Sequence, residues 1–163
     1  MAVRKVLFEE ETALRRLILP DLDRGRPNFD RPHTEAVVFW MKRICKSEPS
    51  LDEKVLVTAA YAHDWGYTEM FKSKTTLDRI HKQKYEHMKR GAEKIRKFLQ
   101  GFENSFARAQ VDRVAHLVAV HDKLTEVKEK DEIALVEADT LGQLDTDFVK
   151  PTFSPQDNNR YIK

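Results

Sequence analysis

The sequence predicts an all-α protein that folds as one bundle of about six helices. Apolar residues recur at helical spacing along most of the 163-residue chain, and the chain holds only five glycines. No pair of alternating segments joined by a hairpin turn is found. A chain of this length can bury a substantial core, so we expect residues 1–163 to form a single domain.

The expected helices follow from these apolar patterns and from the breakers between them. The first covers about Val3–Leu19 and ends before Pro20, and a loop rich in Pro, Gly and Asp continues to residue 30. Pro32 suits the first turn of the second helix, which closes at Glu48–Ser50, because that turn needs no backbone donor there. The other four run over about Leu51–Gly66, Arg79–Leu99, Ala109–Leu124 and Asp131–Leu144.

Composition excludes several kinds of site and partner. The 29 basic and 27 acidic residues nearly cancel, so charge gives no argument for a nucleic-acid or membrane partner. Cys45 is the only cysteine, which excludes an intramolecular disulfide and a thiolate metal site. No apolar stretch approaches the roughly 20 residues needed to span a bilayer, and the start of the chain lacks a signal-peptide core. We therefore expect a cytoplasmic protein, whose oligomeric state no pattern indicates.

Several His and Asp residues share the apolar sides of their predicted helices. The His63-Asp64 pair is a weak motif by itself, but His63 continues the apolar stripe of its helix. Four other helices each direct one such side chain toward their apolar side, namely His33, His87, His121 and Asp139. Burying Asp64 and Asp139 without compensation would cost several kcal/mol. A divalent cation removes this cost for all of them together.

Nitrogen and oxygen ligands without sulfur suit Mn, Fe, Co, Mg or Zn, with geometry rather than affinity selecting among them. The order His33, His63-Asp64 and Asp139 on an all-α chain resembles the HD domain superfamily of metal-dependent phosphohydrolases, over about residues 30–145. The resemblance implies that these four residues bind one metal ion. Members with two ions carry two further histidines, which His87 and His121 match, and Asp64 would then bridge the ions as the central catalytic ligand.

His116 and His81 compete less well for these two positions. His116 lies about 140° around the helix from His121, and His81 lies near the expected start of its helix. We interpret both as surface or structural histidines, which leaves His121 and His87 as the expected ligands.

The resemblance implies hydrolysis of a phosphate ester of a nucleotide or similar small metabolite by a metal-activated water. Basic residues near the ligands are the candidates for phosphate contacts. Arg24 and Arg26 belong to this group by position, and the favoured substrate contacts are Arg31, Lys72, Lys74 and Arg79. Some members carry a Lys three positions after the Asp of the pair, where this chain has Tyr67. Nothing beyond nearness supports Glu69 as a general acid or base.

Two other functions stay open at this point. A few families on the same scaffold use six comparable ligands for di-iron oxygenase chemistry, and scaffold alone does not decide chemistry. A non-catalytic nucleotide-binding or regulatory module is the other alternative, although such modules typically lack a ligand and none is missing here.

Overall fold

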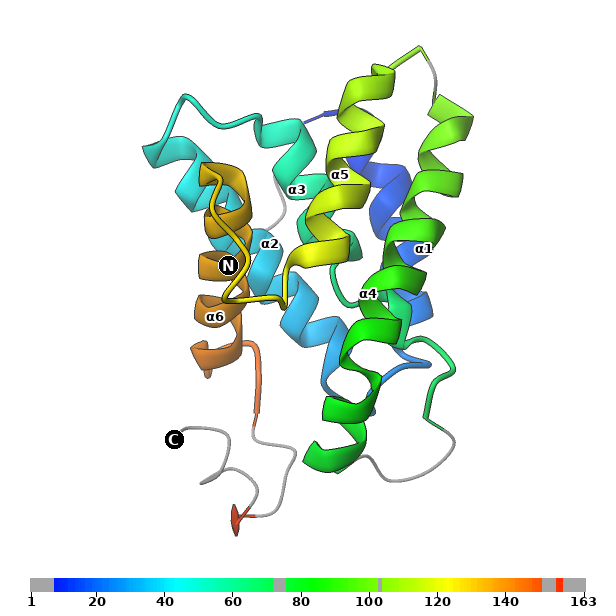
Figure 1. Ribbon diagram of the computed structural model, residues 1–163, viewed down its shortest axis with the longest axis vertical. Helices are drawn as coiled ribbons and strands as arrows, with labels where there is room; N and C mark the ends of the chain where they lie inside the picture. Colours follow the sequence, from blue (N-terminus) through cyan, green and yellow to red (C-terminus); the bar gives the residue numbers. More distant parts are fainter. Residues whose placement is uncertain (1–7, 72–75, 103, 151–154, 157–163) are drawn as a thin grey trace.

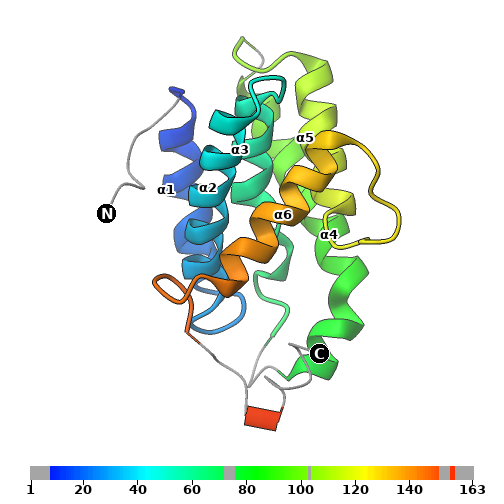
Figure 2. The same cartoon turned by 90° about the vertical axis from the view of Figure 1, so that its left-hand side faces the viewer.

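The computed structural model describes residues 8–71, 76–102, 104–150 and 155–156. This part of the chain forms six α-helices and two short 3-10 turns and contains no strand, which confirms the predicted all-α class (Figures 1 and 2). In chain order they are α1 (Glu11–Leu22), α2 (Asp30–Ser47), α3 (Glu53–Ala62), η1 (Trp65–Tyr67), α4 (Leu77–Leu99), η2 (Gln100–Phe102), α5 (Arg108–Val120) and α6 (Lys130–Leu144). None of the described helices is long and apolar enough to cross a membrane.

Helix α3 is the centre of the bundle. All eight residues from Val55 to Ala62 are buried, and α3 contacts each of the other five helices. Its start is fixed by Asp52, whose side chain accepts a hydrogen bond from the Val55 amide at 3.1 Å. Because three of the buried residues are alanines, neighbouring helices approach α3 closely on every side. The end of this buried helix is therefore a well-defined place for a site.

Two helix pairs flank α3. Helix α6 lies across α2 (Figure 2), and α4 lies beside α5 (Figure 1). The α2–α6 pair is close because Gly142 faces Val37, where an added Cβ would come within 2.7 Å of the valine side chain. Trp40 of α2 donates a 2.9 Å hydrogen bond to Asp145, directly after α6. These contacts bring the middle of α6 over the start of α2.

Several predicted helix boundaries differ from those observed. The expected end before Pro20 is wrong, since α1 continues to Leu22. Tertiary contacts hold this last turn: Leu22 is fully buried, and Asp21 accepts hydrogen bonds from Trp65 Nε1 at 2.6 Å and Lys94 Nζ at 2.9 Å. The expected start near Val3 lies outside the described residues, as does most of the polar tail after residue 150.

Candidate metal centre

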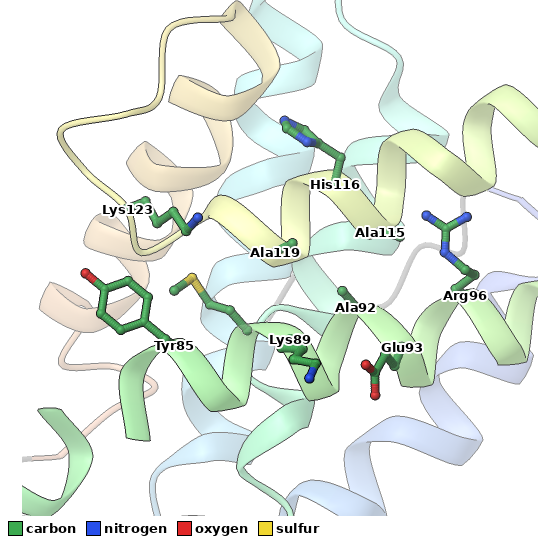
Figure 3. A pocket seen from close by; sticks show the side chains of 10 residues that line it. Tyr85, Lys89, Ala92, Glu93, Arg96, Ala115, His116, Ala119 and Lys123 are labelled. Carbon is green, nitrogen blue, oxygen red and sulfur yellow. The ribbon is translucent and has the colours of Figure 1, made fainter. Parts of the chain in front are cut away.

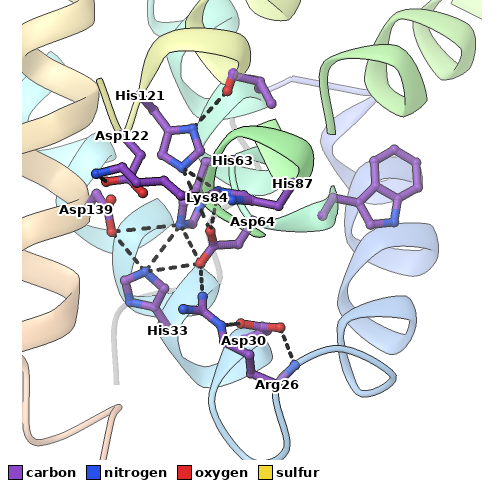
Figure 4. A network of polar contacts seen from close by, with 12 residues as sticks. Arg26, Asp30, His33, His63, Asp64, Lys84, His87, His121, Asp122 and Asp139 are labelled. Carbon is purple, nitrogen blue, oxygen red and sulfur yellow. Dashed lines mark hydrogen bonds and ion pairs between the residues drawn. The ribbon is translucent and has the colours of Figure 1, made fainter. Parts of the chain in front are cut away.

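Six His and Asp side chains from five helices and the turns after them meet inside the bundle (Figure 4). Three come from within helices: the first turn of α2, the middle of α4 and the middle of α6. The other three directly follow α3 or α5. In chain order they are His33, His63, Asp64, His87, His121 and Asp139. All four histidines and Asp64 are buried, and the Asp139 side chain is 16% exposed.

The first part of the cluster joins α2, the end of α3 and α6. His33 Nε2 lies 3.2 Å from His63 Nε2 and 2.9 Å from Asp139 Oδ1. Asp64 Oδ2 lies 3.3 Å from His63 Nε2 and 3.7 Å from His33 Nε2. Neighbouring ligand atoms about 2.1 Å from one ion lie about 3.0–3.4 Å apart, so these spacings suit a single divalent cation.

The second part joins α4 and the end of α5 to the other oxygen of the same carboxylate. His87 Nε2 lies 3.4 Å from His121 Nε2 and 3.5 Å from Asp64 Oδ1, and His121 Nε2 lies 3.8 Å from that oxygen. The two oxygens of Asp64 therefore face two different groups of imidazoles. Each of these groups has the spacing of a metal site, and Asp64 belongs to both.

Hydrogen bonds on the far side of two rings fix how they face the cluster. His63 Nδ1 lies 2.8 Å from the Ala60 carbonyl oxygen, and His121 Nδ1 lies 2.8 Å from the Val118 carbonyl oxygen. A carbonyl can only accept, so each Nδ1 carries a proton and Nε2 is the ring nitrogen left to bind a metal ion. Metal-binding histidines are usually oriented in this way, through a hydrogen bond from the other ring nitrogen.

The pKa values of the cluster are set by burial and by its two carboxylates. Burial disfavours a charged His63, but the carboxylates of Asp64 and Asp139 outweigh burial and raise its pKa to about 9. Burial would raise the pKa of Asp139, yet His33 and His63 hold it at about 2. Burial, assisted by His121, lowers the pKa of His87 to about 3. The carboxylates therefore stay ionised, and His87 stays neutral as a ligand must.

Comparison with protein-family profiles matches residues 32–145 to the HD domain. The chain belongs to the HD domain family. The match covers α2 to α6 and every residue of the His/Asp cluster, and HD domains bind divalent metal ions. Comparisons with curated proteins and with solved structures gave no match.

A buried guanidinium supports the shared carboxylate of this HD domain. Arg26 donates through Nη2 to Asp64 Oδ2 and through Nε to Asp30, and its side chain is only 11% exposed. Burial opposes a charged side chain, but Asp30 and Asp64 raise the pKa of Arg26 far above its ordinary value. Within the described residues Nη1 has no hydrogen-bond partner, and Figure 4 shows it on the side of His33. The Nη1 group of Arg26, which stays charged, is thus available beside the cluster as a hydrogen-bond donor.

Tyr67 occupies the position where some HD domains carry Lys, and its ring has a packing role. It stacks on His87 with ring centroids 3.9 Å apart, and the carbon of the Arg26 guanidinium lies 4.2 Å from the centroid of the Tyr67 ring. Phe29 contacts the same guanidinium at 4.5 Å. The two aromatic rings hold Arg26 in place through cation–π contacts. At this position the chain therefore has no positive charge of its own, and Tyr67 instead packs against the charged Arg26 side chain.

The cluster opens into a cavity of about 570 Å³, a volume typical of small-molecule sites. Asp64, His121 and Asp139 line it together with Arg26. Lys84 of α4 also lines the cavity, and its Nζ lies 3.0 Å from Asp122 Oδ1. Sequence reasoning did not identify Lys84, although it lies three residues before His87 and so on the same side of α4.

Neither of the two favoured substrate-binding residues that the structure describes, Arg31 and Arg79, lines this cavity. Arg31 pairs with Asp23 at 2.8 Å, and its side chain is 43% exposed. Arg79 is exposed with its guanidinium 5.9 Å from the Phe71 ring, and neither arginine lines the cavity. Lys72 and Lys74 lie outside the described residues. Arg26, one of the basic residues noted before His33, is the arginine that reaches the ligands.

His116 and His81, the two other histidines, lie outside the cluster. His116 is among the residues that line a separate hollow of about 530 Å³ between α4 and α5 (Figure 3), and its Nε2 lies 2.6 Å from Glu132 Oε1. His81 is exposed and lines the cavity at the His/Asp cluster. Glu69 is paired with Arg24, and its side chain is 63% exposed. Of the α5 histidines, His121 is thus the one within the cluster.

Proposed function

We propose that this HD domain hydrolyses a phosphate ester of a small metabolite, with nucleotides as the first candidates, at a centre that holds two divalent ions. The observation that carries the proposal is the position of Asp64, whose two oxygens face two separate sets of imidazoles. His33, His63 and Asp139 would complete one metal site, and His87 and His121 the other. Divalent ions there would supply Lewis acidity, lowering the pKa of a water molecule and neutralising phosphoryl charge.

The chain's own residues would bind and orient the ester. Arg26 fixes the rotation of Asp64 through Nη2, and its free Nη1 can donate to a non-bridging phosphoryl oxygen. Lys84 places a second positive charge on the cavity wall. Phosphoryl transfer depends mainly on positioning and on neutralising charge at the equatorial oxygens, which is what these cations provide. A buried arginine beside the ligands favours a phosphorylated substrate over the oxygenase alternative.

The test is phosphate release from a panel of nucleotides and sugar phosphates by protein loaded with Mn²⁺ or Fe²⁺. We expect Asp64→Asn and His121→Gln to lose activity by at least about a hundredfold, because each removes or weakens a direct ligand of the proposed metal ions. His116→Gln is the matched control, since His116 is on α5 but lies outside the cluster and pairs with Glu132.

Metal content and oxygen uptake separate the alternatives. We expect two equivalents of metal per wild-type chain by elemental analysis, and one after His121→Gln. Equal phosphate release by wild type and Asp64→Asn would refute the hydrolase. Oxygen uptake on substrate addition without phosphate release would establish the oxygenase, and tight nucleotide binding without turnover under any metal would establish the regulatory module.

A further inference from the structure

Five of the residues that line the cavity at the His/Asp cluster are aliphatic. They are Leu77, Ile80, Leu124, Val136 and Leu144, and together they form the aliphatic wall of the cavity. Leu77 and Ile80 lie on the first turn of α4, and Leu144 is the last residue of α6. The wall is therefore built from elements that also carry or adjoin metal-site ligands.

Two residues of the wall are unusually exposed for leucines. The exposed fraction is 59% for Leu124 and 67% for Leu144, whereas Leu77 is 3% exposed. Scattered exposed leucines are ordinary on protein surfaces. These two, however, line one cavity together with three other aliphatic side chains and the metal cluster. A ligand held at the cluster would cover them.

The charged groups beside this wall already have partners. Lys84 is paired with Asp122 at 3.0 Å, and Arg26 donates to Asp30 and Asp64. Of the Arg26 nitrogens, Nη1 has no hydrogen-bond partner among the residues that the structure describes, and Figure 4 shows it on the side of His33. The aliphatic wall itself offers mainly dispersion contacts and removal of apolar surface from water.

We propose that this aliphatic wall selects phosphate esters whose leaving group carries a flat, apolar portion and discriminates against esters of polyhydroxylated alcohols. The inference rests on the proposed function and deepens it. A polyol placed against the wall would lose its hydrogen bonds to water without replacement, which costs free energy. An aromatic ring in the same place loses no such bonds and covers Leu124 and Leu144. A nucleotide meets this requirement through its base.

The test compares benzyl phosphate with ribose 5-phosphate, two primary alkyl esters, on metal-loaded full-length protein. We expect kcat/KM to favour benzyl phosphate by at least about tenfold, since small changes of apolar contact in a pocket alter specificity by that order. In Leu124→Ser and Leu144→Ser this preference should fall toward parity, mainly through a raised KM for benzyl phosphate. Leu17→Ser is the control, because Leu17 is a 43% exposed leucine on α1, outside the cavity.

Binding of benzylphosphonate and methylphosphonate separates failure of the inference from failure of the proposed function. Neither compound can be hydrolysed, so calorimetry with metal-loaded protein reports recognition alone. Tighter binding of benzylphosphonate that weakens in Leu124→Ser and Leu144→Ser would support the wall even if no ester were hydrolysed. Equal affinity for the two phosphonates, or the same effect in Leu17→Ser, would overturn the inference even if hydrolysis were observed.

Discussion

Replacing Gly66 by Ala should disturb the second proposed metal site, although Gly66 itself bears no ligand. A Cβ at Gly66 would lie 1.8 Å from the carbonyl oxygen of His87 and 2.9 Å from the amide nitrogen of Gly91. Both contacts are with the backbone of α4, so no side-chain rotation can relieve them. To reach an ordinary contact of 3.4 Å, the His87 carbonyl must move by about 1.6 Å relative to η1.

The expected consequences follow from this displacement. Overpacking of a tight contact typically costs about 1–3 kcal/mol, which for a domain of this size lowers Tm by about 2–12 °C. His87 Nε2 now lies 3.5 Å from Asp64 Oδ1, and coordination tolerates only about 0.2 Å of error in bond length. We therefore expect Gly66→Ala to lose one equivalent of metal, from the site of His87 and His121, and to keep the other.

Thermal unfolding and elemental analysis measure these two effects. Gly101→Ala is the matched control, because a Cβ at Gly101 meets nothing within 4 Å. The control should keep its metal and change in stability by no more than about 1 kcal/mol, in the stabilising direction. If Gly66→Ala unfolds at the same temperature as Gly101→Ala and binds the same metal, the close approach of η1 to α4 is not what positions His87.

Three further perturbations test other contacts. Arg26→Met leaves Asp64 without its buried partner, so we expect a loss of about 3–5 kcal/mol in metal-free protein and a clearly smaller loss with Mn²⁺, measured by unfolding; equal losses would contradict this. Because His63 has a pKa of about 9, it holds a proton below that pH which a metal ion must displace. The affinity of the protein for the metal ion, measured by competition with a chelator, should therefore rise about tenfold per pH unit from about pH 7 to 9 and then level. An affinity that does not change with pH would contradict this. Trp40→Phe removes the 2.9 Å bond to Asp145 and should lower stability by about 1 kcal/mol with metal content unchanged; an unaltered Tm would show that this bond does not stabilise the α2–α6 pair.

Sequence alone determined the helices and the residues of the cluster. The 3.6-residue period is a local property, so the apolar stripe of each helix already shows which His and Asp face the core. For that reason His33 and His87 could be assigned within α2 and α4, and His121 could be preferred to His116. The HD match, over residues 32–145, spans all of these residues.

Only the tertiary structure decided which basic side chain contacts the cluster and how each histidine ring of the cluster is oriented. Arg26 and Arg31 lie five residues apart near the start of α2, and nothing local separates them. Arg26 reaches Asp64, 38 positions away, and its guanidinium contacts the rings of Phe29 and Tyr67. Long side chains take the orientation that distant partners impose, whereas helical phase is set by the backbone within a few residues.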